Sequence, residues 1–202
     1  MATLTQALAY SALFGGRRDA RGSIEDKCVR EIVTPIHFLK HLSGEVSLGI
    51  YLLTEDICYF AAIDIDEPRF ELALELKVAL YDRSVPSHIA RSRSGNHHLY
   101  VFSDSCFKAV TIRRVLQGVA YKQKMWSPNG TEAKQWATER GMKHPVEIFP
   151  KQDSVRTAPG GLGNFIHLPF FGDQRPFLDS RGNPVTLEFF LENVRVVSSR
   201  TE

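Results

Sequence analysis

The stretch CYFAAIDIDEP, residues 58–68, places two aspartates at the end of an apolar run. Side chains on a strand alternate between its two faces, so Asp64 and Asp66 point the same way while the isoleucines beside them face the opposite side. Two carboxylates about 5 Å apart repel by roughly 3 kcal/mol at an effective dielectric constant of about 20. A divalent cation between them turns this repulsion into attraction, and oxygen ligands suit magnesium or manganese. The alternative is that Asp66 starts a turn before Pro68 and that Asp64 caps a neighbouring element.

A third acid, Glu147, stands alone within the apolar tetrapeptide VEIF, residues 146–149. On a strand, the period of two places Glu147 on the face opposite Val146 and Ile148. Three carboxylates on neighbouring strands would form the oxygen-rich site of two-metal phosphoryl transfer. A lone strand glutamate more often faces solvent, so Glu147 joins the two aspartates only if the two strands are adjacent.

The segment RSRSGNHHLYVF, residues 91–102, combines a tight turn with hydrogen-bond donors. Its Gly-Asn pair permits backbone N–H groups to point at an anion, and its arginines and serines suit phosphate oxygens. His97 and His98 are adjacent, so on a strand they face opposite ways. This arrangement argues against a rolling-circle nickase, which needs two metal-binding histidines two residues apart. One histidine is expected to join the acidic site and the other to pack or meet solvent. A generic basic β-hairpin is the alternative.

Hydrophobic periodicity along the rest of the chain predicts a mixed α and β protein. Amphipathic patterns predict helices over 4–14, 34–42, 68–82 and 107–122. Apolar and β-branched runs predict a hairpin of 48–53 with 58–66, a hairpin of 87–92 with 97–102, and short strands over 146–149 and 163–171. The segment 125–145 is polar, contains Pro and Gly, and carries no assignment.

Composition is that of an ordinary soluble globular protein, with 43% hydrophobic and 24% charged residues among 202. This length suits one sizeable core, and no linker divides the chain, so we expect one folded unit. No apolar run is long enough to span a bilayer, and the N-terminus lacks a signal-peptide pattern. Three widely spaced cysteines fit a reducing compartment and rule out a CxxC zinc site. We therefore expect a cytoplasmic protein that binds no membrane.

The formal net charge of +2 does not by itself indicate a nucleic-acid-binding protein. Basic residues are nevertheless clustered in 15–21, 91–94 and 113–124. Such clusters can follow a phosphate backbone even when the whole chain is close to neutral. Solvated helix faces and loops are the alternative for each cluster.

Taken in order, these motifs resemble the archaeo-eukaryotic primase superfamily, which includes the primase-polymerases. The motifs are the DxD pair, SRSGN followed by His, EIFPKQD and GLGNFIHLPF. The resemblance is strongest to the primase domain of TOTE conflict systems and to CRISPR-associated primase-polymerases. It extends into the N-terminal third through ALFGGRRDARG and HLSGEVSLGIYLLTEDICYFAAIDID. It covers about residues 12 to 172 and is weakest over 121–145.

The resemblance implies an α+β fold, in which an RRM-like antiparallel or mixed catalytic sheet over about 58–172 is tightly fused to an N-terminal α/β unit over about 1–57. Both parts would form a single catalytic domain, 1–202. Accompanying helicase and nuclease regions are not part of the chain, which is expected to be a catalytic core.

The family's functional positions map onto particular residues of this chain. Asp64, Asp66 and Glu147 match its metal-binding and catalytic acids. The positions that match its nucleotide-binding residues are Arg93, Ser94, His98, Lys151, Gln152, Asn164 and His167. Family members usually have two residues between SGN and the histidine, whereas one residue intervenes here before His98. Leu99 and Tyr100 follow His98 as the family's hydrophobic-aromatic pair does, which favours His98 over His97.

These matches imply a DNA-dependent primase-polymerase, a nucleotidyltransferase that uses nucleoside triphosphates on a single-stranded DNA template with two Mg²⁺ or Mn²⁺ ions. Template contacts are expected from basic residues in two clusters, Arg17, Arg18, Arg113, Arg114, Lys122 and Lys124. Helicase or CRISPR adaptation proteins encoded elsewhere are the implied protein partners. Two alternatives are a metal-dependent nuclease or nickase, since the same acids can activate water, and a non-catalytic nucleic-acid-binding module of RRM-like fold.

Overall fold

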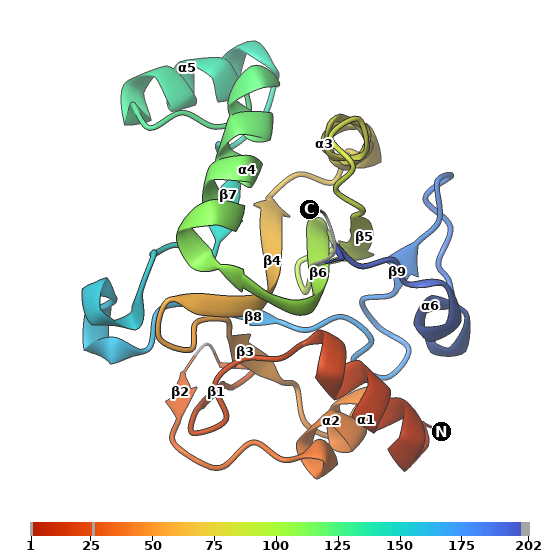
Figure 1. Cartoon of the computed structure of the whole chain (residues 1–202). Coiled ribbons are helices and arrows are strands. Elements are labelled where there is room, and N and C mark those ends of the chain that lie inside the picture. Colours follow the sequence, from red (N-terminus) through yellow and green to blue (C-terminus); the bar gives the residue numbers. More distant parts are fainter. Residues whose placement is uncertain (1, 26, 199–202) are drawn as a thin grey trace.

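A computed structural model of the protein describes residues 2–25 and 27–198 (Figure 1). Its helices are α1 (Leu4–Leu13), α2 (Pro35–Leu42), α3 (Phe70–Tyr81), α4 (Ala109–Lys122), α5 (Gly130–Glu139) and α6 (Leu187–Asn193). Its strands are β1 (Arg21–Gly22), β2 (Cys28–Val29), β3 (Gly49–Tyr51), β4 (Ile57–Ile65), β5 (His88–Arg91), β6 (His97–Lys108), β7 (Glu147–Phe149), β8 (Phe165–His167) and β9 (Phe177–Leu178). The expected α+β class is confirmed.

Two antiparallel sheets organise these elements. The larger sheet has the order β7-β4-β6-β5-β9, and the smaller sheet has the order β2-β1-β3-β8. Strand β8 follows the larger sheet's β7 in the chain, yet it pairs with β3 of the smaller sheet. The N-terminal sheet is therefore completed by a strand from the later part of the chain.

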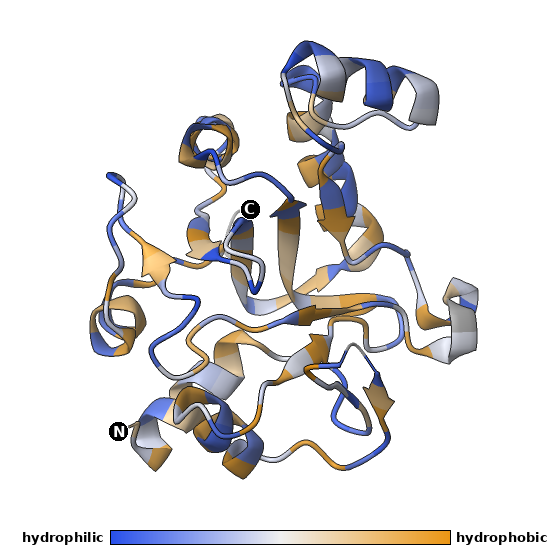
Figure 2. Cartoon of the chain, turned by 180° about the vertical axis from the view of Figure 1, so that it is seen from behind, coloured by the Kyte–Doolittle hydropathy of each residue, from blue (hydrophilic) through white to orange (hydrophobic). Residues whose placement is uncertain are grey.

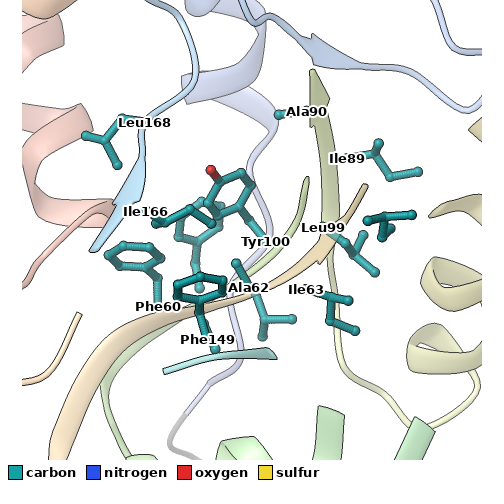
Figure 3. Close-up of a cluster of buried hydrophobic side chains, with 14 of the residues drawn as sticks. Phe60, Ala62, Ile63, Ile89, Ala90, Leu99, Tyr100, Phe149, Ile166 and Leu168 are labelled. Carbon is teal, nitrogen blue, oxygen red and sulfur yellow. The ribbon is translucent and has the colours of Figure 1, made fainter. Parts of the chain in front are cut away.

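The larger sheet is covered on both faces. Residues such as Ile63 and Leu99 point toward α3 and α4, whereas Phe60 and Tyr100 point toward α1 and the smaller sheet (Figure 3). On this second face the ring of Phe14, at the end of α1, lies 5.1 Å from that of Phe60. Figure 2 shows hydrophobic residues along the central strands and a largely hydrophilic α5 projecting from the body.

Most predicted elements are present, but the hairpin of 48–53 with 58–66 is wrong. Strand β3 is paired with β1 and β8, and β4 is paired with β6 and β7. A tight turn closed by Thr54 and Ile57 joins the two strands without pairing them further. Both strands are apolar on both faces, so each can be central in its own sheet, and the local pattern does not distinguish this from a hairpin.

The unassigned segment 125–145 contains α5. Its start is marked by Asn129, whose side chain accepts hydrogen bonds from the N–H groups of Thr131 and Glu132. Asparagine is among the preferred N-cap residues, because its oxygen satisfies N–H groups that have no partner within the helix. The far end is fixed where Arg140 pairs with Glu75 of α3.

Phe165 of β8 lies against two glycines of the smaller sheet. Gly22 and Gly49 are register partners, and a Cβ atom on either would meet the Phe165 ring. At Gly49 the nearest ring carbon would be 2.5 Å away. The two glycines therefore allow β8 to approach closely, and β8 carries Phe165 and His167 to the edge of the cavity described below.

We expect Gly49→Ala to lower the free energy of unfolding by about 1–3 kcal/mol, because the added methyl group overpacks the Phe165 contact. Urea denaturation measures this change. In a Phe165→Leu background the same substitution should cost less, since the ring is gone. An equal cost in both backgrounds would show that the ring is not the cause.

Buried His41 of α2 forms hydrogen bonds to the residue just before β3 and to the segment that follows β8. Its Nδ1 accepts a hydrogen bond from the Leu48 N–H at 3.0 Å, and its Nε2–H donates to the Pro169 carbonyl at 2.8 Å. The side chain is 0% exposed. Burial lowers the pKa of His41 to about 4, so the ring is neutral at pH 7.

Stability should therefore fall as the pH drops from about 6.5 to about 4. In that window the unfolded chain binds a proton at His41 that the folded chain does not, so unfolding is favoured by up to on the order of 3 kcal/mol. Chemical denaturation across the window measures this dependence. The variant His41→Gln lacks this imidazole, so its stability should depend less on pH across the window, while all other titrating groups are unchanged. If the free energy of unfolding varied with pH equally in both proteins, His41 would not be the cause of the dependence.

Candidate active site

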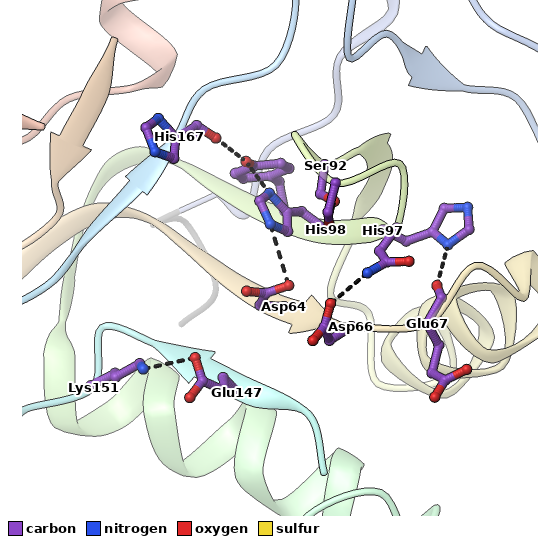
Figure 4. A network of polar contacts seen from close by, with 12 residues as sticks. Asp64, Asp66, Glu67, Ser92, His97, His98, Glu147, Lys151 and His167 are labelled. Atoms are coloured by element: carbon purple, nitrogen blue, oxygen red, sulfur yellow. Dashed lines mark hydrogen bonds and ion pairs between the residues drawn. The ribbon is translucent and has the colours of Figure 1, made fainter. Parts of the chain in front are cut away.

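A cavity of about 770 Å³ opens at one end of the larger sheet. Asp64, His98 and Glu147 form part of its lining (Figure 4). Because side chains alternate along a strand, Asp64 is on the face of β4 that also carries Phe60. Helix α4, α5 with the segments that flank it, the turn between β5 and β6, and β8 border the rest of the cavity. The sheet supplies a rigid floor, and the helices and turns supply walls that rise above it.

The strand register lines up the predicted site residues. Asp64 of β4 is the direct partner of His98 on β6 and of Glu147 on β7. Directly paired residues of antiparallel strands project from the same face with Cβ atoms about 4.5–5.5 Å apart. The adjacency that the sequence left open is thus present, and Glu147, Asp64 and His98 form one row across three strands. Asp66 lies two residues beyond Asp64, just past the end of β4.

Each of the three acids at the site, Asp64, Asp66 and Glu147, has a basic or amide partner. The Asp64 carboxylate lies 3.3 Å from Nε2 of His98, and Lys151 Nζ lies 2.7 Å from the Glu147 carboxylate. The Asn96 side-chain amide donates to Asp66. Within residues 2–25 and 27–198, no three His, Cys, Asp or Glu side chains are gathered closely enough to hold a metal ion. The carboxylates share one cavity, but their oxygens do not converge.

Tyr100 holds the His98 ring from the side away from Asp64. Its hydroxyl lies 3.0 Å from His98 Nδ1 and donates to the His167 carbonyl at 3.2 Å. Burial, followed by the charge of Asp64, raises the pKa of Tyr100 well above its usual value, so the hydroxyl keeps its proton. The chain of contacts from His167 through Tyr100 to His98 orients the imidazole toward Asp64.

His97 and His98 have separate environments. His97 is 0% exposed, and its Nδ1 donates to the Glu67 carbonyl at 3.0 Å, on the face opposite the cavity. Its ring centroid lies 5.8 Å from that of Phe70 in α3. Burial lowers the pKa of His97, which keeps the ring neutral. Of the two histidines, His98 is the one that lines the cavity.

The turn between β5 and β6 brings more polar groups to the rim. Ser92 accepts a hydrogen bond from the Gly95 N–H, and the Ser92 and Ser94 hydroxyls lie 2.9 Å apart. Gly95 has φ of +86°, a left-handed conformation that favours glycine. The turn presents Ser92, Arg93 and Ser94 to the cavity. Arg93 also donates to the Ile24 carbonyl, which ties this turn to the N-terminal part of the chain.

A smaller cavity of about 410 Å³ adjoins the first. It shares Asp64, His98, Lys151 and His167 with the larger one and adds Asn164. Gln152 does not line either cavity, but its side-chain amide donates to Asn164 Oδ1 at 2.9 Å. All seven residues that match nucleotide-binding positions therefore lie in, or one contact away from, these joined cavities.

Of the six predicted template-binding residues, one lines the larger cavity, three are exposed to solvent and two bind other parts of the fold. Arg113 lines the larger cavity, where it pairs with Asp153. Arg114, Lys122 and Lys124 are exposed on α4 and just after it.

Arg17 and Arg18 have partners within the fold. The Arg17 guanidinium binds Asp19 and donates to the Gly161 carbonyl at 2.7 Å. Arg18 donates to the Ser11 carbonyl, and its guanidinium lies 5.2 Å from the centre of the Phe38 ring. Both arginines thus help to hold the N-terminal segment in place.

Several lining residues were not predicted from the sequence. The larger cavity is also lined by Gln117, Trp126, Ser127 and His144, which come from α4 and the segment around α5. Of these, Gln117 has a sequence signal, because it lies four residues after Arg113 and therefore on the same face of a helix. Trp126 and His144 lie in the unassigned segment and carry no such signal.

Comparison with known proteins gives one family. Residues 20–201 match the archaeo-eukaryotic primase domain of the TOTE conflict system. No curated protein matches the chain. Among solved structures, the polymerase domain of ligase D from Mycobacterium tuberculosis, solved in complex with DNA, shares 14% identity with a TM-score of 0.38. The alignment covers 88% of this chain and 67% of that one. None of the helices in residues 2–25 and 27–198 is long and apolar enough to cross a membrane.

We expect Tyr100→Phe to preserve the fold but to release the His98 ring. Loss of one buried hydroxyl contact should lower the free energy of unfolding by about 1 kcal/mol. The His98 ring signals in an NMR spectrum should broaden or shift, while those of His97 on the other face should not. Unchanged His98 signals would show that Tyr100 does not orient this ring.

Proposed function

The chain belongs to the archaeo-eukaryotic primase domain family of the TOTE conflict system, and we propose that it is a DNA-dependent primase-polymerase. In this proposal the protein transfers nucleotidyl groups from nucleoside triphosphates to a growing strand on a single-stranded DNA template. The observation that carries the proposal is the row of Glu147, Asp64 and His98 across three adjacent strands at the floor of the cavity.

The donor chemistry of the cavity fits divalent cations, and to hold them the carboxylates would leave their present partners and converge. Asp64, Asp66 and Glu147 offer only oxygen ligands to one cavity, and such ligands suit Mg²⁺ or Mn²⁺. We assign the holding of two such ions to these three residues. When bound, the ions supply activation of a 3′-hydroxyl and neutralisation of charge on the triphosphate and the departing pyrophosphate.

Charge balance supports a triphosphate as the second occupant. Among the described residues that line the larger cavity, the three carboxylates are matched by three fixed cations, Arg93, Arg113 and Lys151. Cations that join the carboxylates would leave the cavity positively charged, which favours a polyanion. Lys151 and Arg113 now contact Glu147 and Asp153, so they would exchange these carboxylates for phosphate oxygens.

The remaining polar residues would position the triphosphate. His98 is held by Tyr100 and faces the carboxylates, and Ser94 adds a hydroxyl from the β5–β6 turn. Asn164 and His167 approach from β8 on the other side. Preorganised donors of this kind contribute by electrostatics and orientation, which account for most of the rate enhancement in phosphoryl transfer.

Carboxylate substitution tests the proposal. The double substitution Asp64→Ala and Asp66→Ala should reduce primer extension by more than about 100-fold, because loss of even an outer contact to a bound metal costs 10–100-fold. The matched control is Asp82→Asn, an exposed acid at the end of α3. The assay uses unprimed and primed single-stranded DNA with labelled ribonucleotides or deoxyribonucleotides and Mg²⁺ or Mn²⁺.

Extension that survives the double substitution would contradict the assignment. Cleavage of single-stranded DNA in Mn²⁺ without triphosphates would instead identify a nuclease. Binding of DNA with neither product nor cleavage would identify a non-catalytic binding module. Product length separates short-primer synthesis from polymerisation, and comparison of primed with unprimed template separates extension from initiation.

A further inference from the structure

The polar side chains of the larger cavity can account for phosphates and cations, but a base also needs a large apolar ring face to stack on. Trp126 is the single Phe, Tyr or Trp side chain among the described residues that line this cavity. The half-buried indole also packs against the hydrophobic core. One side of Trp126 is thus supported by the protein while another borders the cavity.

The backbone around Trp126 is held at three points. Lys124 adopts a left-handed conformation with φ of +52°, which reverses the chain after α4. Met125 is 0% exposed, and its carbonyl accepts a hydrogen bond from the Val146 N–H at 3.0 Å. The Ser127 hydroxyl donates to Glu132 in the first turn of α5. Because Val146 directly precedes Glu147, Trp126 is anchored next to the strand that carries the third acid.

The two phenylalanine rings that line the smaller cavity have neighbours over or beside them. In the smaller cavity Lys151 Nζ lies 5.0 Å from the centre of the Phe149 ring, and Phe165 lies against Gly22 and Gly49. For Trp126, no ring pair or overlying cation is present within the part of the chain that the structure describes. Its indole is the ring best placed to stack on a base.

The position of Trp126 favours a polynucleotide strand over the incoming nucleotide. In the larger sheet, β7 lies on one side of β4 while β6 and β5 lie on the other. The β5–β6 turn with Arg93 and Ser94 is therefore across the cavity from Trp126, which is beside β7. Exposed Lys122 and Lys124 lie just before Trp126 in the chain. A flat ring with exposed cations within four residues of it in the chain is a combination that suits binding of single-stranded nucleic acid.

We propose that Trp126 is a stacking platform for a base of the single-stranded polynucleotide, opposite the site of the triphosphate. This inference rests on the proposed function for the identity of the strand. It makes Trp126 a binding residue of the template side, in a segment where the sequence predicted no element.

The chain contains two tryptophans, which allows each to be observed separately. Trp136 of α5 lies outside the cavity lining, 5.1 Å from Tyr121 between ring centres. In a Trp136→Phe protein, Trp126 is the single fluorophore of this type, and in a Trp126→Phe protein Trp136 is the matched control. Each protein is titrated with a thymidylate 12-mer and, separately, with dATP, in the absence of divalent ions.

We expect the 12-mer to quench the fluorescence of the Trp136→Phe protein and to leave that of the Trp126→Phe protein nearly unchanged. The substitution Trp126→Leu fills similar space without a flat ring and should raise the Kd for the 12-mer about 10-fold. Trp126→Phe keeps a ring and should restore most of the affinity. Thermal melting of both variants shows whether they are folded.

Two results would overturn the inference. One is quenching of Trp126 by dATP but not by the 12-mer, which would assign the ring to the incoming nucleotide. The other is an equal Kd for the 12-mer in folded Trp126→Leu and Trp126→Phe proteins. The proposed polymerase activity fails separately: a protein that never extends a primer can still show Trp126 quenching, and an active polymerase can lack it.

Discussion

The pairing of β4 with both β6 and β7 is the constraint on which the site depends. This register makes Asp64 the direct partner of His98 on one side and of Glu147 on the other. A shift by one residue in either ladder would turn His98 or Glu147 to the opposite face, because side chains alternate along a strand. The apolar residues of β4 prevent such a shift, since Phe60 and Ile63 are buried against different layers. The hydrophobic core thus determines which polar groups meet.

The same arrangement explains how a row of acids is tolerated in a folded protein. The Asp64 carboxylate is next to His98, Glu147 is next to Lys151, and Asp66 accepts from Asn96. Each partner reduces the repulsion between neighbouring carboxylates. His98 and Lys151 also line the cavity, where exchange of partners does not require the core to open. The acids are therefore balanced by polar contacts that a charged ligand can replace.

The sequence predicted those parts of the fold and site that depend on local patterns. The DxD pair, α3 and the β5–β6 turn follow from alternation, helical periodicity and turn residues within a few positions. Whether Glu147 lies beside Asp64 depends on pairing across more than eighty residues, and only the structure answers it. The predicted hairpin failed for the same reason, because β3 pairs with β8 from far along the chain. Trp126 was missed because its position is set by the Met125 to Val146 contact and not by any periodicity.

The crossing of β8 from the later part of the chain into the N-terminal sheet has a consequence for synthesis. When a ribosome has released the chain only as far as β6, β3 has an unpaired edge and the smaller sheet lacks a strand. His167 and Asn164, which border the site, are added with that strand. The N-terminal part therefore cannot complete its folding as an independent early unit, and the order of events during translation is fixed by where β8 stands in the chain.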